Sequence, residues 1–261
     1  MRKLSSVFLL VILLMLLCSC YKNELTDNEI VPVTVEKEME QQQVVGDEAE
    51  SSLFGKTIVI DAGHGLNSYN KQEKIAPNTN ETKIAFASGT AGKNQTEEEL
   101  NLSVALFLER ELKNKNAVVF MTRTTHETDM TNIDRAEFAN NNNADISVKI
   151  HADGNNNSSL SGVSVLIPGS KYISDTNILE KSKCAGEYVL SEYVKSTGAI
   201  NRGIVERNDL TGFNWTKVPI ILVEMGFMTN PSEDALMEST EYQKKIVDGI
   251  VNGLELYFET L

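Results

Sequence analysis

From Leu53 onward, short apolar runs alternate with segments of helical periodicity, and this alternation constrains the fold more than any other feature of the sequence. Residues 57–61 (TIVID) form a run of strand length, and residues 97–114 place leucines and a valine on one helical face. Further strands are predicted at 117–122, 145–151, 162–167 and 219–224, and further helices at 133–141, 179–196 and 241–258. This order of elements predicts a single α/β domain over residues 53–261, built as a βαβ-type layered sheet.

The first twenty residues have the pattern of a signal peptide. Arg2 and Lys3 precede an apolar run at residues 7–17, which is shorter than the roughly 20 residues that a membrane-spanning helix needs. Residues 17–20 (LCSC) resemble a bacterial lipoprotein box, and this resemblance implies that Cys20 is acylated and becomes the mature N-terminus. The alternative is an ordinary secretory signal that is cleaved nearby and leaves no anchor.

Residues 21–52 are acidic and rich in glutamine, with few large apolar side chains, and this composition predicts a flexible linker. The chain carries a formal net charge of −13, which argues against nucleic acid as a partner because phosphates would repel such a surface. The same charge disfavours electrostatic adhesion to anionic lipid, so a covalent anchor is the simpler attachment to a membrane. We therefore expect an extracytoplasmic, membrane-anchored monomer, in which Cys184 is a small core residue of a helix.

Three ionisable side chains lie at the ends of three predicted strands. His64 follows the first strand, and His151 and Glu224 end two others. In open α/β sheets the carboxyl ends of the strands form the edge where ligands bind. A carboxylate at the end of an apolar strand is costly to bury unless it is paired or binds a metal. The alternative to a metal site is that Glu224 pairs with Lys217 or Arg207, while hydrogen bonds satisfy the histidines.

Two histidines need a third ligand to hold a catalytic zinc ion, and His₂Glu with an open fourth position is a known catalytic set. The triplet Glu97, Glu98 and Glu99 at the start of a predicted helix offers that ligand. The helix dipole favours negative charge at a helix N-terminus without any metal, so the triplet also has a structural explanation. The spacing does not select one of the three glutamates. Thr96 before the triplet predicts a capping box with Glu99.

Two predicted loops, at residues 63–95 and 193–218, are long for a compact domain, and loops of this length are usually functional. A short piece of the second loop, around residues 203–205, is a candidate for extended structure. His126 lies in a polar segment and is expected to be a solvated surface residue. Trp215, the single tryptophan, either packs its loop against the core or lines a groove.

Three sequence blocks contain the strand-end side chains described above: residues 58–65 (IVIDAGHG), 148–153 (VKIHAD) and 221–230 (ILVEMGFMTN). In this order and spacing they resemble the blocks of zinc-dependent N-acetylmuramoyl-L-alanine amidases, and the resemblance extends over residues 56–258. It implies a mixed, mostly parallel sheet with helices on both faces. The loop at residues 66–95 is longer than in minimal members of the family.

By this resemblance Glu224 is expected to be the catalytic carboxylate, and the expected Zn²⁺ ligands are His64, Glu97 and His151. The family's ligand glutamate lies three residues before the leucine of a Glu-x-x-Leu-Asn-Leu pattern, here EEELNL, and Glu98 is the alternative if the register shifts by one. The implied activity is hydrolysis of the amide bond between N-acetylmuramic acid and L-alanine in peptidoglycan. The alternatives are a zinc peptidase that cuts within the stem peptide and a non-catalytic wall-binding lipoprotein.

Overall fold

A computed structural model describes residues 50–66 and 70–261, and these residues form one compact unit. The predicted signal peptide at 1–20, with Cys20, and the linker up to residue 49 lie outside the described residues. Ser51 and Ser52, at the end of the predicted linker, donate hydrogen bonds to the carboxylate and the main-chain carbonyl of Glu255.

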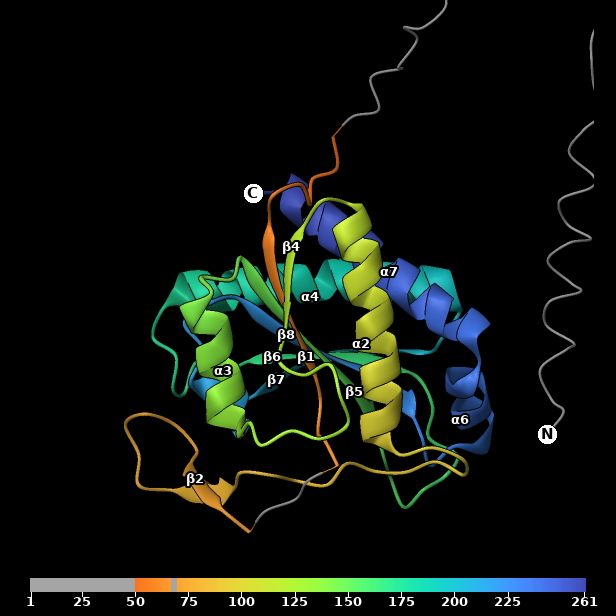
Figure 1. The fold of residues 1–261 in the computed structure, drawn as a ribbon, viewed down its shortest axis with the longest axis horizontal. Helices are drawn as coiled ribbons and strands as arrows, with labels where there is room; N and C mark the ends of the chain where they lie inside the picture. Colours follow the sequence, from red (N-terminus) through yellow and green to blue (C-terminus); the bar gives the residue numbers. More distant parts are fainter. Residues whose placement is uncertain (1–49, 67–69) are drawn as a thin grey trace, which may run out of the picture. The chain divides into compact units, whose positions relative to one another are not determined.

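The elements follow the predicted alternation of strands and helices (Figure 1). The strands are β1 (Thr57–Ala62), β2 (Gln72–Lys74), β3 (Thr82–Ile84), β4 (Val118–Met121), β5 (Ile146–Asp153), β6 (Val163–Pro168), β7 (Asn201–Arg207) and β8 (Ile220–Phe227). The helices are α2 (Glu97–Asn114), α3 (Asn132–Asn141), α4 (Thr176–Thr197), α5 (Thr211–Asn214), α6 (Pro231–Glu238) and α7 (Thr240–Glu259).

The central sheet has the strand order β4-β1-β5-β8-β6-β7. Its neighbouring strands run parallel, except that β6 pairs with β8 in the antiparallel sense. The mixed, mostly parallel sheet that the resemblance implies is therefore confirmed. Because β1, β5 and β8 run parallel, their carboxyl ends lie at the same edge of the sheet.

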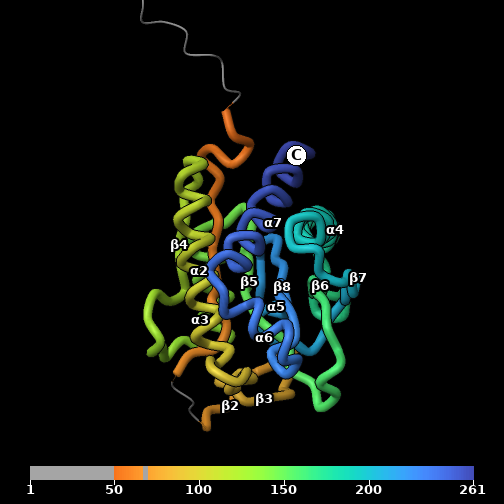
Figure 2. The backbone as a smooth tube through the Cα atoms, turned by 90° about the vertical axis from the view of Figure 1, so that its right-hand side faces the viewer, coloured from red at the N-terminus to blue at the C-terminus, as the bar shows by residue number. Residues whose placement is uncertain are grey.

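Helices cover both faces of the sheet, as predicted. Alternate residues of β1 point to opposite faces: Ile58 and Ile60 join the large core with residues of α2, α4 and α7, whereas Val59 packs with Ala139 of α3. Figure 2 shows α2, α7 and α4 side by side across the first face. A smaller cluster around Phe213 of α5 packs on the other face of β6 and β8. Both faces of the sheet are thus buried at the central strands β1, β5 and β8, as expected for parallel strands.

The two long loops contain regular structure, of which the sequence predicted only the extended piece around residues 203–205, now part of β7. Within residues 63–95, β2 and β3 form a short antiparallel hairpin. It is held by Glu73, whose carboxylate accepts hydrogen bonds from Asn132 Nδ2 (2.7 Å) and Ile133 N (3.2 Å) at the start of α3. Within residues 193–218, α4 continues to Thr197 and β7 and α5 follow. The strands of the hairpin are short and polar, so they show no periodicity in the sequence. The contacts of Glu73 with α3 hold the hairpin instead.

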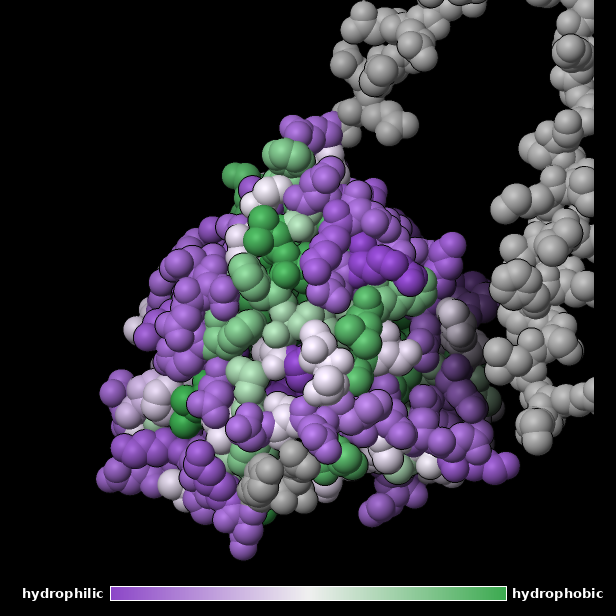
Figure 3. All heavy atoms as spheres, in the orientation of Figure 1, coloured by the Kyte–Doolittle hydropathy of each residue, from purple (hydrophilic) through white to green (hydrophobic). Residues whose placement is uncertain are grey.

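The two edge strands of the sheet differ in chemistry. On β4, Val118 and Phe120 are exposed, and Figure 3 shows apolar side chains over this strand between predominantly hydrophilic surfaces of α2 and α3. The opposite edge strand, β7, carries the charged side chains Arg202, Glu206 and Arg207. Within the described residues, none of the helices combines the length and apolar character required to span a bilayer.

Candidate metal centre and groove

The carboxyl ends of β1, β5 and β8 bring three of the predicted site residues together. His64 lies two residues beyond the end of β1, His151 lies in β5 and Glu224 lies in β8. His151 and Glu224 are register partners on adjacent parallel strands, which lie about 4.8 Å apart. Paired positions of neighbouring strands point to the same face, so the two side chains project on one side of the sheet.

Glu97 reaches this edge from the first turn of α2. Thr96 caps the helix: its Oγ1 accepts a hydrogen bond from Glu99 N (3.4 Å), and Glu99 Oε2 accepts one from Thr96 N (2.7 Å). The predicted capping box is therefore confirmed. In this capping box the carboxylate of Glu99 caps the N-terminus of α2. Glu97, in contrast, is buried, with 4% of its surface exposed.

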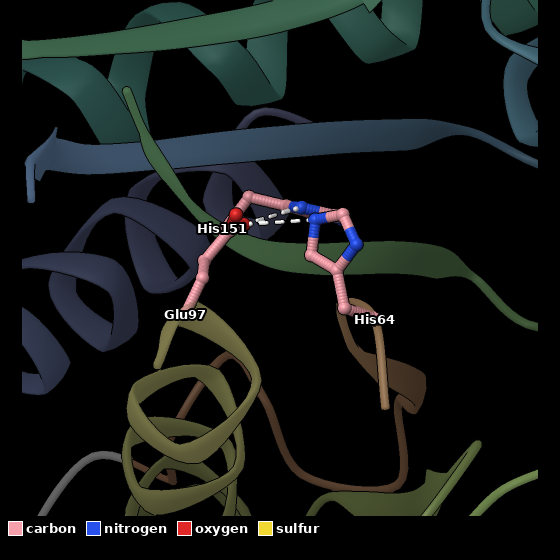
Figure 4. A group of neighbouring side chains, drawn as sticks. All are labelled: His64, Glu97 and His151. Atoms are coloured by element: carbon pink, nitrogen blue, oxygen red, sulfur yellow. Dashed lines mark hydrogen bonds and ion pairs between the residues drawn. The ribbon is translucent and has the colours of Figure 1, made fainter. Parts of the chain in front are cut away.

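His64, Glu97 and His151 point toward one another (Figure 4). Glu97 Oε1 lies 3.0 Å from His64 Nε2 and 3.1 Å from His151 Nδ1. The two imidazole rings meet edge-on, with centroids 4.8 Å apart and planes inclined by 80°. The three side chains offer one ligand atom each, and these atoms all lie within 4.8 Å of one another.

This triad fits the donor set of a catalytic zinc site. Two imidazole nitrogens and one carboxylate leave a fourth tetrahedral position open, and ligand atoms on such a zinc lie roughly 3.4 Å apart. His64 Nδ1 lies 2.7 Å from the carbonyl oxygen of Ala87, and an Nδ1–H donated to that carbonyl leaves Nε2 as the unprotonated nitrogen that faces the cluster. The second carboxylate oxygen of Glu97 accepts from Thr90 N (2.9 Å), and Asn101 Nδ2 (3.2 Å) donates to the first.

Two glycines leave room for the triad. A Cβ on Gly63 would lie 2.3 Å from the His151 ring, and a Cβ on Gly89 would lie 2.6 Å from Glu97 Oε2. His64 itself has a φ of +59°, a left-handed conformation that is uncommon for a residue other than glycine. The left-handed backbone at His64 and the absence of a side chain at the two glycines allow the side chains of the triad to approach one another.

Burial and mutual contacts shift the pKa values of the triad in opposite directions. Burial raises the pKa of Glu97, but its hydrogen bonds with His151 and His64 outweigh this effect and leave the pKa well below its usual value. Burial lowers the pKa of His151, and the nearby His64 lowers it further against the opposing contact with Glu97, to about 4. Burial also lowers the pKa of His64, but its hydrogen bond with Glu97 outweighs this effect and raises that pKa above its usual value. The environment therefore favours a charged Glu97 and a neutral His151, which are protonation states that bind a metal.

Glu224 has a different environment. Its Oε2 is fully covered and has no hydrogen-bond partner among the described residues. Burial raises the pKa of Glu224 well above its usual value, the negative charges of Glu97 and Asp153 raise it further, and Arg207 opposes them. A carboxylate that holds a proton this readily is suited to proton transfer.

A buried ion cluster supports the same edge of the sheet from the α3 side. Asp61 of β1 accepts hydrogen bonds from Thr122 Oγ1 (2.6 Å) and Arg135 Nη1 (2.6 Å) and pairs with Lys149. Arg135 also donates to the carbonyl oxygens of Ala62 (2.8 Å) and His64 (2.6 Å). Arg123 donates to Ala62 O and Gly63 O as well. The cluster thereby fixes the main chain that carries His64.

Glu98, the alternative ligand, points elsewhere. Its Oε2 lies 3.0 Å from His126 Nδ1 and 3.6 Å from Arg123 Nη1. The His126 side chain is 53% exposed, so the expected surface histidine is confirmed, although it has this acidic partner. Of the three glutamates in the triplet, only Glu97 joins the two histidines.

The predicted alternative pairing of Glu224 is absent among the ion pairs of the described residues. Lys217 lies 3.8 Å from Glu137 instead, and Arg207 pairs with Asp209. Trp215 packs its loop against the hairpin, because its Nε1 donates a hydrogen bond to Lys74 O (3.1 Å). Cys184 is half-buried and packs against the large core, as expected.

Several supporting residues were not assigned a role from the sequence. Asp61 lies in the first block that carries the resemblance, Asn101 lies in the EEELNL pattern at the start of α2, and Arg135 lies in α3. The sequence could have indicated these residues, because each places a charged or amide side chain on an otherwise apolar strand or helix face. Thr90 and Ala87 act through main-chain atoms, and a pattern of side chains does not reveal such contacts.

A groove with a volume of about 310 Å³ opens beside Glu224. Its lining combines acidic, basic and apolar side chains, and includes Glu224, Asp153, Asn155, Arg202, Arg207 and Phe227. A smaller cavity of about 50 Å³ lies beside His64, between that residue and the chain that leads from the hairpin to α2. The groove therefore gives an extended ligand access to the edge of the sheet where the triad lies.

Residues 58–256 match the N-acetylmuramoyl-L-alanine amidase family. This match spans more than half of the chain and includes the triad and Glu224. The chain belongs to this family. LytC of Bacillus subtilis, an N-acetylmuramoyl-L-alanine amidase, is 26% identical over 214 residues, which are 82% of this chain and 38% of LytC.

Solved structures of other amidases support the assignment of this chain to the family. The N-acetylmuramoyl-L-alanine amidase of Clostridium difficile 630 is 30% identical with a TM-score of 0.65, and the match covers 79% of this chain and 98% of that one. The amidase Ami1 of Mycobacterium smegmatis is 27% identical with a TM-score of 0.73 and covers 81% and 100% of the two chains. The predicted family, fold class and enzyme class are confirmed.

Proposed function

We propose that this amidase is a zinc-dependent hydrolase that cleaves the bond between N-acetylmuramic acid and L-alanine in peptidoglycan. The observation that carries this proposal is the convergence of His64 Nε2, Glu97 Oε1 and His151 Nδ1 at one edge of the sheet. Glu224, with a covered and unpaired oxygen, is the register partner of His151 on the adjacent strand. These features match the donor set and the proton acceptor that metal-assisted amide hydrolysis requires.

In this proposal His64, Glu97 and His151 hold the zinc ion. When bound, zinc polarises the scissile carbonyl and lowers the pKa of water to about 7. The hydrogen bonds that Glu97 accepts from Thr90, Asn101 and Ala152 fix the orientation of its carboxylate. His64 is fixed in the same way by the carbonyl of Ala87.

Glu224 acts as the general base and then as the general acid. It takes a proton from the attacking water and delivers it to the nitrogen of L-alanine as the amide C–N bond breaks. The burial that raises the pKa of Glu224 allows it to retain this proton between the two steps. Proton transfer of this kind typically contributes about 10²- to 10⁴-fold to the rate.

The location of the enzyme is part of the proposal. Lipid on Cys20 anchors the chain to the membrane on its extracytoplasmic side, and the linker at residues 21–52 lets a monomeric catalytic domain reach the wall. In cells fed a labelled fatty acid, the wild-type chain is expected to take up label and Cys20→Ala is expected to lose it. Cys18→Ala is the matched control. Label retained by Cys20→Ala would contradict the anchor.

The enzymatic proposal is tested by digestion of purified peptidoglycan with the zinc-loaded protein, followed by mass analysis of the products. We expect free L-alanine amino groups with intact glycan. The variant Glu97→Ala is expected to lose zinc and activity. Glu98→Ala is expected to keep both, because Glu97 contacts His64 and His151 whereas Glu98 contacts His126. Cleavage inside the stem peptide would instead support a peptidase, and no cleavage by the zinc-loaded protein would support a binding role.

A further inference from the structure

The edge strand β7 borders the groove beside Glu224 and places two arginines in it, Arg202 and Arg207. The chain as a whole is strongly acidic, with a net charge of −13, and the same groove also contains the carboxylates of Glu224 and Asp153. An anionic group of a ligand is therefore repelled by most of this protein. Within the groove it finds a favourable position only beside β7.

The two arginines are not equivalent. Arg207 makes a bidentate contact with Asp209, in which Nε and Nη2 each lie 2.7 Å from a carboxylate oxygen. Its charge is thereby balanced by a neighbour on the same chain. Arg202 has no such acidic partner among the described residues. It is the cation of the groove that remains available for an anion from outside.

Arg202 is nevertheless held in place. Its Nη1 donates to the carbonyl oxygen of Ser161 at 3.3 Å, and its guanidinium carbon lies 5.1 Å from the centroid of the Phe227 ring. Phe227 ends β8, three residues after Glu224. These contacts use one N–H and one face of the guanidinium, which has five N–H donors in a fixed fork. The remaining donors are available in an orientation set by the aromatic ring.

We propose that Arg202 is a specificity residue that binds a free carboxylate of the stem peptide, on the residue that follows L-alanine. This inference rests on the proposed function, because it places the scissile amide beside Glu224. The leaving L-alanine and the residue after it then extend along the groove toward Phe227 and Arg202. A guanidinium fork matches a carboxylate in a bidentate contact, whereas a carboxamide at the same position presents one oxygen and no charge.

The test uses two synthetic muramoyl peptides that differ at one group. In one, the residue after L-alanine is glutamate with its main-chain carboxylate free, and in the other that carboxylate is amidated. The zinc-loaded wild-type enzyme is expected to cleave the free acid with a kcat/KM about 10- to 100-fold higher than the amide, as a charge-assisted hydrogen bond contributes. We expect the difference to lie mainly in KM, because the contact is remote from the reacting atoms.

The variant Arg202→Ala is expected to lower kcat/KM for the free acid to the level of the amide and to leave the amide unchanged. Arg202→Lys keeps the positive charge but lacks the guanidinium fork. Its kcat/KM for the free acid is expected to lie between those of the wild type and Arg202→Ala. Arg110→Ala is the matched control, because Arg110 also lies over an aromatic ring, that of Phe107 at 4.3 Å, but on the outer surface of α2. It is expected to behave as wild type.

Three results would overturn the inference. The wild-type enzyme could cleave both substrates equally well, which needs no variant and refutes carboxylate recognition directly. Arg202→Ala could lower kcat/KM for both substrates by the same factor, which would indicate a structural role. Finally, a zinc-loaded wild-type enzyme that cleaves neither substrate nor peptidoglycan would refute the proposed function itself, and the inference with it.

Discussion

Two glutamates at the same edge of the sheet, Glu97 and Glu224, differ in almost everything but their side-chain chemistry. Glu97 contacts two histidines and accepts hydrogen bonds from the main-chain N–H groups of Thr90 and Ala152. Glu224 has a covered oxygen with no hydrogen-bond partner among the described residues. Their pKa values move apart accordingly, that of Glu97 downward and that of Glu224 upward.

Under the proposed function, this difference in environment suits the two glutamates to two different roles. A carboxylate surrounded by donors stays charged and fixed, which suits a metal ligand. A carboxylate that is buried without donors binds a proton more readily, which suits a general base. The predictions below test this division of roles, and they run from the largest expected effect to the smallest.

Glu224→Gln is expected to lower kcat by about 10²- to 10⁴-fold while zinc content stays unchanged, because the amide keeps the shape of the side chain but cannot accept the proton. Turnover of purified peptidoglycan and metal analysis of the same sample check both halves of this prediction. Glu187→Gln, at an exposed position of α4, is the control. Near-normal turnover of Glu224→Gln would contradict the role of Glu224 as the general base.

Asp61 sharpens the comparison, because it is a third buried carboxylate and is fully paired. Burial raises the pKa of Asp61, but Lys149 and Arg135 outweigh it and hold that pKa well below its usual 3.8. Asp61→Asn leaves two buried cations unbalanced and is expected to lower the free energy of unfolding by about 3–5 kcal/mol in urea titrations. A loss below about 1 kcal/mol would mean that the cluster does not stabilise the fold.

The sign of the pH effect follows from the lowered pKa of Asp61. The wild-type stabilisation from this group is complete above the unfolded-state pKa near 3.8 and is lost as the pH falls through the folded-state pKa. Asp61→Asn is therefore expected to lack this part of the acid dependence. Equal acid sensitivity of the two proteins would assign the acid dependence to other groups.

Asn101→Ala tests whether the partners of Glu97 matter. Asn101 is fully buried and its Nδ2 lies 3.2 Å from Glu97 Oε1. Its removal is expected to weaken zinc binding by about 10- to 100-fold, as loss of a group that orients a ligand does. Asn114→Ala, at the exposed end of α2, is the matched control. Competition with a chelator measures both affinities, and equal values would contradict the role of Asn101.

Asp153→Asn tests the environment of Glu224. Burial is the main cause of the raised pKa of Glu224, and the negative charge of Asp153 adds to it. Removing that charge lowers the pKa of Glu224, so the acid limb of the kcat/KM profile is expected to move to lower pH, by less than about one unit. The comparison uses zinc-loaded enzymes. A shift to higher pH would contradict the assignment of Glu224 as the base.

Much of the fold was predictable because it depends on periodicity. The strands at β1, β5 and β8 are apolar runs, and α2 begins at Glu97 as its cap predicts. Three of the site residues were accessible by the same route, since parallel strands end at one edge of the sheet. The choice of Glu97 over Glu98 came from the resemblance, because spacing alone left the two open.

What the sequence did not predict depends on contacts between distant segments. The β2–β3 hairpin is held by Glu73 against α3 and leaves no clear local pattern. Of β7, which pairs with β6 alone, the sequence indicated only the piece around residues 203–205. The main-chain carbonyl of Ala87 and the N–H of Thr90 act on the triad irrespective of their side chains. The helix α6 begins at Pro231 and is too short to show a helical repeat in the sequence.

The most direct test of the central claim is anomalous diffraction at the zinc edge from crystals of the zinc-loaded protein. The account predicts one ion at about 2.0–2.2 Å from His64 Nε2, His151 Nδ1 and a carboxylate oxygen of Glu97, with Glu224 nearby but not among its ligands. An ion bound directly by Glu224, or a site formed without Glu97, would contradict the division between the two glutamates.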